Sequence, residues 1–270
     1  MENLSMEMDI YYVDAFTDQQ FKGNSAAVVP VSEWPAVELM QNIAIENNLS
    51  ETAFIKPLED NRYAIRWFSP ITEIDFCGHA TLASSYVLFH HLGVTETIEF
   101  VTSKVGTLVV CLNDAKQIEM SFPVQNPEPV ADVPQALFDG LSCRPISVLK
   151  NRQAYVVVLA NERDVREVQY DSALLKTLAP YDVVVTAAGD DYDFVSRYFW
   201  PANGGDEDPV TGSIHAGLTP YWAKQLNKSV FRAYQASRRG GVLHCKLCDD
   251  RVVVSGNGVL YMKGRLFVAG

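Results

Sequence analysis

The feature that most constrains the fold is a repeat that relates the two halves of the 270-residue chain. Three pairs of sites match in the same order along the sequence. They are Arg66-x-Phe68-x-Pro70 with Arg197-x-Phe199-x-Pro201, Gly78 with Gly212, and Ser103-x-x-Gly106 with Ser237-x-x-Gly240. The first pair has an offset of 131 residues and the other two have 134, which fits one loop insertion. The sequence therefore predicts two topologically similar domains.

Strand patterns dominate both halves, in short runs rich in β-branched and aromatic residues. Helices are expected at 34–47, 79–92, 171–178 and 213–226. The predicted fold class is α+β, with domains over about 1–125 and 126–270. Each domain is expected to wrap antiparallel or mixed strands around a mostly apolar helix. The closing segment VLYMKGRLFVAG is interpreted as a strand pair able to pack back on the first half.

The composition narrows the classes of function. There are 22 basic and 33 acidic residues, a net charge of −11, and no basic run beyond Arg238-Arg239, so a nucleic-acid partner is not expected. No apolar run is long enough to span a membrane, and MENLSMEMDIYYV lacks the pattern of a secretory signal. Five scattered cysteines do not suggest a disulfide framework. These features predict a cytoplasmic protein.

Two glycine turns suggest a binding site for a small anion. Gly78 is expected to open one helix, and Gly212 with Ser213 to open its counterpart. Helix N-termini present unpaired amides and partial positive charge, so two of them facing a cleft between the halves would bind a small carboxylate. The structural alternative is that Thr211 and Ser213 only cap a helix.

Cys77 and His79 stand two residues apart at the first of these turns. Side chains at i and i+2 do not face each other on a helix, so a thiolate–imidazolium pair is not expected. No metal site is expected either, since the two potential ligands have no matching pair elsewhere. The helix dipole predicts a neutral His79 and a more acidic Cys77. Cys245 and Cys248 would point to opposite faces of a strand, which argues against zinc there.

Glu51 is the candidate general base. In NNLSETAFI it begins a strand on which Glu51, Ala53 and Ile55 share one face. The carboxylate then lies either at the solvent edge or in a desolvated place, where its pKa would rise toward values useful in catalysis. Asp182 has the same position in the second half of the repeat. Spacing alone leaves both candidates open.

Several segments together resemble a known family. They are DAFTDQQFKGNSAAVV (14–29), NNLSETAFI (47–55), RWFSPITEIDFCGHATLASS (66–85), SRYFWPANGGDEDPVTGSIHA (196–216) and QASRRGG (235–241). This ordered set spans nearly the whole chain and resembles the phenazine-biosynthesis PhzF-like isomerase family, in which the Glu-Asp-Pro-Val-Thr-Gly-Ser run is specific. That family is similar in fold to diaminopimelate epimerase, with two like domains.

The resemblance implies a cofactor-free isomerase that acts on a small carboxylate-bearing substrate. Its glutamate, which corresponds to Glu51 and not Asp182, would move a proton from one carbon to another of the same molecule. The substrate contacts implied are Gly78, His79, Asp208, Gly212 and Ser213. Family members are commonly homodimers, so a homodimer is implied here. Neither the substrate nor a role in phenazine production follows from the sequence.

Cys77 marks a departure from the founding phenazine enzyme. It stands where the epimerase relatives carry a catalytic thiol, but the matching loop EDPVTGS contains no cysteine. A mechanism with two thiols is therefore not available. Two alternatives stay open: a one-substrate epimerase or racemase that uses Cys77 with Glu51, and a non-catalytic binding or scaffold protein with the same fold.

Overall fold

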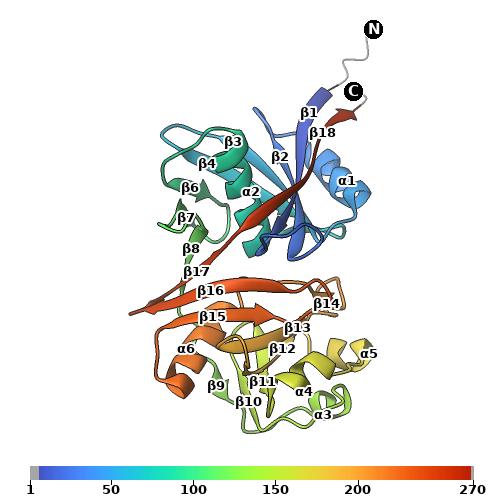
Figure 1. Cartoon of the computed structure of the whole chain (residues 1–270). Helices are drawn as coiled ribbons and strands as arrows, with labels where there is room; N and C mark the ends of the chain where they lie inside the picture. The colour runs from blue at the N-terminus through green and yellow to red at the C-terminus, as the bar shows by residue number, and fades with distance from the viewer. Residues whose placement is uncertain (1–5, 269–270) are drawn as a thin grey trace. The chain divides into compact units, whose positions relative to one another are not determined.

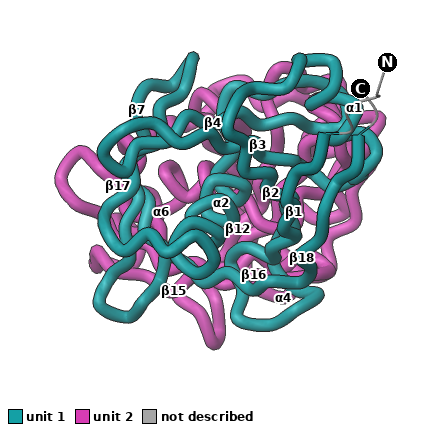
Figure 2. Tube along the Cα trace, turned by 90° about the horizontal axis from the view of Figure 1, so that it is seen from above, with its two compact units in different colours: residues 1–120, 256–270 teal, residues 121–255 magenta. Residues whose placement is uncertain are grey.

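The computed structural model describes residues 6–268. Within this part the chain forms two compact units, shown in teal and magenta in Figure 2. The first contains the chain up to Met120 and again from Gly256, and the second contains Ser121–Ser255. The chain thus leaves the first unit, builds the second and returns.

The first unit is a sheet around one central helix, with a second helix on the other face. Its strands are β1 (Met6–Ala15), β2 (Asn24–Pro30), β3 (Glu51–Pro57), β4 (Arg62–Phe68), β5 (Glu73–Ile74), β6 (Ile98–Val101), β7 (Thr107–Leu112), the start of β8 (Ile118–Pro123) and the returning β18 (Gly258–Val268). Its helices are α1 (Val37–Asn47) and α2 (Gly78–His91). The strands pair in the order β18-β1-β2-β3-β4-β6-β7-β8, parallel only at β2–β3 and β4–β6.

Helix α2 is buried along most of its length, from Gly78 to Leu88, and contacts β1, β2, β3 and β18 (Figure 1). Its apolar and small side chains suit a helix that is enclosed on all sides. Helix α1 packs on the opposite face, where Met40, Ile43 and Ala44 meet Phe54 of β3. Successive residues of a strand alternate between faces. Glu51, Ala53 and Ile55 therefore face away from α1, on the side of α2.

The second unit repeats this topology. Its strands are β9 (Glu128–Pro129), β10 (Ser147–Lys150), β11 (Ala154–Val158), β12 (Asp182–Ala188), β13 (Phe194–Phe199), β14 (Glu207–Asp208), β15 (Val230–Gln235), β16 (Gly241–Cys248) and β17 (Arg251–Gly256). Its helices are α3 (Gln135–Asp139), α4 (Glu162–Glu167), α5 (Ser172–Lys176) and the largely buried α6 (His215–Leu226). The order is β9-β10-β11-β12-β13-β15-β16-β17, parallel at β11–β12 and β13–β15. The predicted α+β duplication is confirmed.

The sequence repeat has a structural basis at each matched site. Arg66 of β4 forms a forked ion pair with Glu73 of β5, and Arg197 of β13 does the same with Glu207 of β14. The two arginines thus hold the same short strand in both units. Gly106 and Gly240 both have positive φ, at 81° and 68°, in the turns that follow β6 and β15. At Gly240 a Cβ atom would also lie 2.0 Å from the Tyr234 hydroxyl, so only glycine fits there.

Several predicted elements differ in extent from those observed. The helix expected at 34–47 begins at Val37, that at 79–92 begins at Gly78, and that at 213–226 begins at His215. The segment interpreted as a closing strand pair is the single strand β18, which pairs with β1 from Met6 to Ala15 through one register shift. Gly264 suggested a turn in this segment, but it pairs with Ile10 inside the ladder and does not interrupt the strand. Helices α3 and α4 were not predicted, since each spans fewer than two turns.

Candidate functional site

Three of the predicted residues lie together in the first unit: Glu51 of β3, and Cys77 and His79 at the start of α2. All three are buried, with exposed fractions of 4%, 6% and 4%. The strand register directs Glu51 toward α2, and the helix N-terminus supplies the other two side chains. The solvent-edge alternative for Glu51 is therefore wrong.

Cys77 and His79 contact each other, contrary to the expectation for residues two apart. Cys77 Sγ lies 3.4 Å from Nδ1 and 3.9 Å from Nε2 of His79. The expectation assumed helical geometry, but Cys77 is the N-cap residue and has extended backbone angles, φ −143° and ψ 117°. This conformation turns its side chain back toward the first turn of the helix. The argument that the pair lacks a further metal ligand is also corrected, because Glu51 lies beside it.

Glu51 and His79 form the closest contact of the cluster. Glu51 Oε2 lies 2.8 Å from His79 Nε2. The contact is not aligned as a hydrogen bond, and Oε2 accepts none within the described part of the chain. A buried carboxylate oxygen without a hydrogen-bond donor is costly in free energy, so such oxygens are uncommon outside reactive sites. Glu51 therefore combines burial, a cationic neighbour and an oxygen able to accept a proton.

His79 does not have the neutral character expected from the helix dipole. Burial lowers the pKa of its imidazole, but the charges of Cys77 and Glu51 and polar contacts with both outweigh burial and hold the pKa well above its ordinary value. Near neutral pH the Cys77 thiol is uncharged, so the group that favours protonation of the His79 imidazole there is the Glu51 carboxylate. A carboxylate in direct contact outweighs the partial charge of a helix end.

Cys77 is also not acidified by the helix N-terminus. Burial, followed by the charge of Glu51, raises the pKa of its thiol to about 11, although His79 acts in the opposite direction. The thiol is therefore protonated at neutral pH and is a poor nucleophile or base.

Asn24 completes the cluster and was missed by sequence reasoning. Its Nδ2 lies 3.0 Å from Nδ1 of His79, and the residue is 1% exposed. It follows Gly23, which has a φ of 63° and at which a Cβ atom would lie 2.1 Å from the Ala15 carbonyl oxygen, so a side chain is excluded. The only sequence signal is this Gly-Asn turn before an apolar strand. Asn24 Oδ1 accepts from Ser50 Oγ at 3.4 Å, so Nδ2 faces the ring and can donate to Nδ1 when that nitrogen carries no proton. A charged ring would need the amide to turn its oxygen toward Nδ1.

In the second unit, Asp208 ends strand β14, and Gly212 and Ser213 lie on the loop between β14 and α6. The Asp208 carboxylate accepts a hydrogen bond of 2.5 Å from Thr211 Oγ1. Gly212 does not open α6 as expected but begins a turn that leads into it, since the amide of His215 donates to the Gly212 carbonyl. Ser213 Oγ accepts from Gln153 Nε2 at 3.0 Å, so its own hydrogen can be donated elsewhere.

Asp182, the counterpart of Glu51, has a different environment. Its two carboxylate oxygens accept hydrogen bonds from the Tyr198 hydroxyl at 2.6 Å and the Asn203 amide at 2.7 Å. Burial raises its pKa although both hydrogen bonds act to lower it. Asp182 is thus engaged by two donors, in contrast to Oε2 of Glu51.

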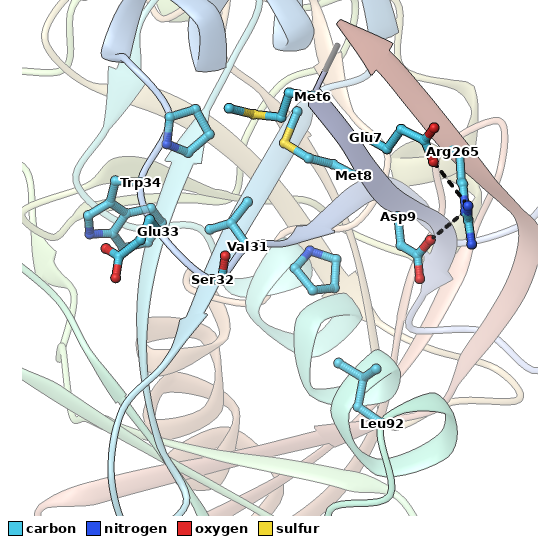
Figure 3. A pocket seen from close by; sticks show the side chains of 12 residues that line it. Met6, Glu7, Met8, Asp9, Val31, Ser32, Glu33, Trp34, Leu92 and Arg265 are labelled. Carbon is cyan, nitrogen blue, oxygen red and sulfur yellow. Dashed lines mark hydrogen bonds and ion pairs between the residues drawn. The ribbon is translucent and has the colours of Figure 1, made fainter. Parts of the chain in front are cut away.

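Two surface hollows of the first unit lie away from the cluster. The hollow in Figure 3 has a volume of about 540 Å³ and is lined by Trp34 and Arg265, with Glu7 and Asp9 paired to the arginine. A second, of about 460 Å³, lies beside Arg66 and Glu73. Neither is lined by Glu51, Cys77 or His79.

Among the described residues no helix is long and apolar enough to cross a membrane.

The chain is similar to known proteins along almost its whole length. Residues 13–264 match the family described as phenazine biosynthesis-like protein (PhzC-PhzF). An uncharacterized isomerase of Halalkalibacterium halodurans is 43% identical, over 97% of this chain and 100% of its own length. A crystal structure of a PhzF-family phenazine biosynthesis protein from Enterococcus faecalis is 43% identical and superposes with a TM-score of 0.93, over 97% of this chain and 100% of that one.

A more distant likeness shows the fold alone. A hydroxyproline epimerase from Agrobacterium vitis is 12% identical, with a TM-score of 0.63 over 99% of this chain and 94% of that one. The duplicated topology is therefore that of the epimerase-like folds. Given the match along almost its whole length and the isomerases among its relatives, the chain belongs to the phenazine biosynthesis-like (PhzC-PhzF) family and is an isomerase that acts on a small molecule.

Proposed function

We propose that the protein moves a proton between two carbons of one small carboxylate-bearing substrate, with Glu51 as the general acid and base. The observation that carries the proposal is the Oε2 atom of Glu51, which is buried, lies 2.8 Å from His79 Nε2 and accepts no hydrogen bond within the described chain. Such an oxygen can take a proton from carbon and return it without first losing a hydrogen bond.

The ionised form of Glu51 is the base, and His79 supports it. A protonated imidazole in direct contact stabilises the carboxylate while it waits for substrate. After abstraction Glu51 is neutral and carries the proton, and its burial shields that proton from exchange with water. The carboxylic acid then protonates the second carbon, which restores the starting carboxylate. This cycle needs no cofactor.

We assign substrate binding to Gly78, His79, Asp208, Gly212 and Ser213. The first-turn amides of α2 favour an anionic group, and Ser213 retains a hydroxyl hydrogen to donate. Asp208 holds Thr211, so its contribution includes fixing the shape of its loop. Together these groups suit a substrate that carries a carboxylate and further polar groups.

Glu51→Gln tests the assignment, with Asp182→Asn as the matched change in the second unit. Glu51→Gln keeps the shape and removes the base, so turnover should fall by at least about 10²-fold, while Asp182→Asn should cost less. Thermal stabilisation by candidate carboxylates should survive Glu51→Gln and should be absent with their methyl esters. Near wild-type turnover of Glu51→Gln together with an inactive Asp182→Asn would place the chemistry in the second unit.

Cys77→Ala separates this reaction from an epimerisation that uses Cys77 opposite Glu51. Because the thiol pKa is about 11, Cys77 is not expected to act as a base. Turnover of Cys77→Ala should therefore fall by less than about tenfold, a barrier change below about 1.4 kcal/mol. A thousandfold loss in a variant that still binds substrate would favour the epimerase.

A further inference from the structure

The cluster of Glu51, Cys77 and His79 also has the composition of a metal site. One ligand atom from each of the three lies within 4.8 Å of the others, and all three residues are buried. Thiolate, imidazole and carboxylate together favour Zn²⁺ and related transition metals over Mg²⁺ or Ca²⁺. Three protein ligands and an open fourth position are a common arrangement for zinc.

Two of the three distances between ligand atoms are close to those that zinc requires. Zinc bonds of about 2.0–2.3 Å in tetrahedral geometry separate neighbouring ligand atoms by about 3.3–3.6 Å. His79 Nε2 lies 2.8 Å from Glu51 Oε2 and 3.9 Å from Cys77 Sγ, on either side of that range. Binding through Nε2 leaves Nδ1 facing the Asn24 amide, which would turn its oxygen toward the ring to accept the outer hydrogen bond that metal-bound histidines usually donate.

A second observation points into the same place. Oε2 of Glu51 is fully enclosed and lacks a hydrogen-bond partner among the described residues, yet it lies next to the ring nitrogen. A divalent cation there would satisfy this oxygen and offset the charges of the carboxylate and a thiolate. The S–H bond of Cys77 and the N–H bond at Nε2 of His79 would break as the metal–sulfur and metal–nitrogen bonds form, and both protons would leave to solvent.

The geometry points to a binding site for a thiophilic divalent metal, with Zn²⁺ bound by Glu51, Cys77 and His79, whose occupancy blocks catalysis. The metal occupies the oxygen that must accept the substrate proton, so the bound form is inactive. The blocking effect, unlike the binding itself, rests on the proposed role of Glu51. The site would make the enzyme sensitive to free zinc.

Cobalt binding tests the site without any turnover. Metal-free protein titrated with Co²⁺ should show thiolate-to-cobalt charge-transfer absorption that saturates at one equivalent and disappears when Zn²⁺ is added. Cys77→Ser should abolish the band, and Glu51→Gln should weaken binding by at least about tenfold, as loss of a direct ligand should cost no less than loss of an outer one. Cys111 is a half-buried cysteine of the same unit, so Cys111→Ser is the matched control and should bind Co²⁺ as the wild type does.

No band in the wild type, or a band that persists in Cys77→Ser or disappears in Cys111→Ser, would overturn the site. Thermal unfolding of each variant shows whether it is folded, and Glu51→Gln gives an independent readout if Cys77→Ser is not. In the turnover assay, stoichiometric Zn²⁺ should reduce the rate at least about tenfold, and a chelator should restore it. Full activity with the site occupied would overturn the blocking effect and leave the binding result standing.

Discussion

Glu51 shows what a single position in a strand decides. Phe54 faces α1, so the alternation along β3 sends Glu51 to the side of α2, into contact with His79. The strand pattern predicted the shared face of Glu51, Ala53 and Ile55. It could not predict burial, because burial depends on a helix that begins 27 residues further along the chain.

His215 is a second buried histidine, and its environment has the opposite effect. Its Nδ1 donates to the Thr211 carbonyl at 2.9 Å, while Nε2 has no partner in the described chain. Burial lowers its pKa to about 4. The ordinary value is about 6.5, so between pH 6.5 and 4 the unfolded chain binds a proton that the folded chain does not. The free energy of unfolding is therefore unaffected by His215 above pH 6.5 and decreases as the pH falls from 6.5 to 4.

His215→Gln should consequently flatten the acid side of the stability profile. Between pH 7 and pH 5 the shift costs the wild type about 2 kcal/mol of unfolding free energy, an amount that the variant should not lose. Urea unfolding at the two pH values measures it. Equal losses in both proteins would show that His215 is protonated in the folded state. The raised pKa of His79 acts in the other direction, since its contribution is present at low pH and lost as the pH rises.

At the scale of elements, the forked arginines fix the strands that precede the functional loops. Arg66 binds Glu73 shortly before Cys77, and Arg197 binds Glu207 next to Asp208. The sequence revealed both arginines through the repeat. Their glutamate partners were not predicted, because two-residue strands such as β5 and β14 have no periodic pattern of their own.

The two ion pairs should differ in strength. The Arg197 and Glu207 side chains are 11% and 17% exposed, against 23% and 35% for Arg66 and Glu73, and Arg197 also donates to the Val168 carbonyl. Lysine cannot make the fork. Arg197→Lys should therefore lower the unfolding free energy by about 1–3 kcal/mol, and Arg66→Lys by less than about 1 kcal/mol, in urea titrations. The reverse order would show that burial does not set the strength of these pairs.

At the scale of the whole molecule, duplication was the most informative property of the sequence. Repeated motifs predicted two like units because both copies need the same arginine fork and the same positive-φ glycine. The site in the first unit was less accessible to prediction. Its contacts depend on the extended backbone of Cys77 and on Asn24, and neither feature has a period that a sequence can display.

The two units have also diverged in their chemistry. Equivalent strands begin with Glu51 and Asp182, yet only Asp182 accepts hydrogen bonds at both oxygens. On this account one copy retains a base for proton transfer, and the other uses the same position to hold its own structure.

The central claim, proton transfer by a single sheltered carboxylate, is tested most directly by turnover in deuterated water. If Glu51 takes a proton from one carbon and returns it to another of the same molecule, part of the original hydrogen should be retained. Mass spectrometry of product from single-turnover reactions should then find less than full deuterium at the new C–H position. Complete deuteration at the shortest times would contradict the account, because it would mean that the proton equilibrates with solvent before it is returned.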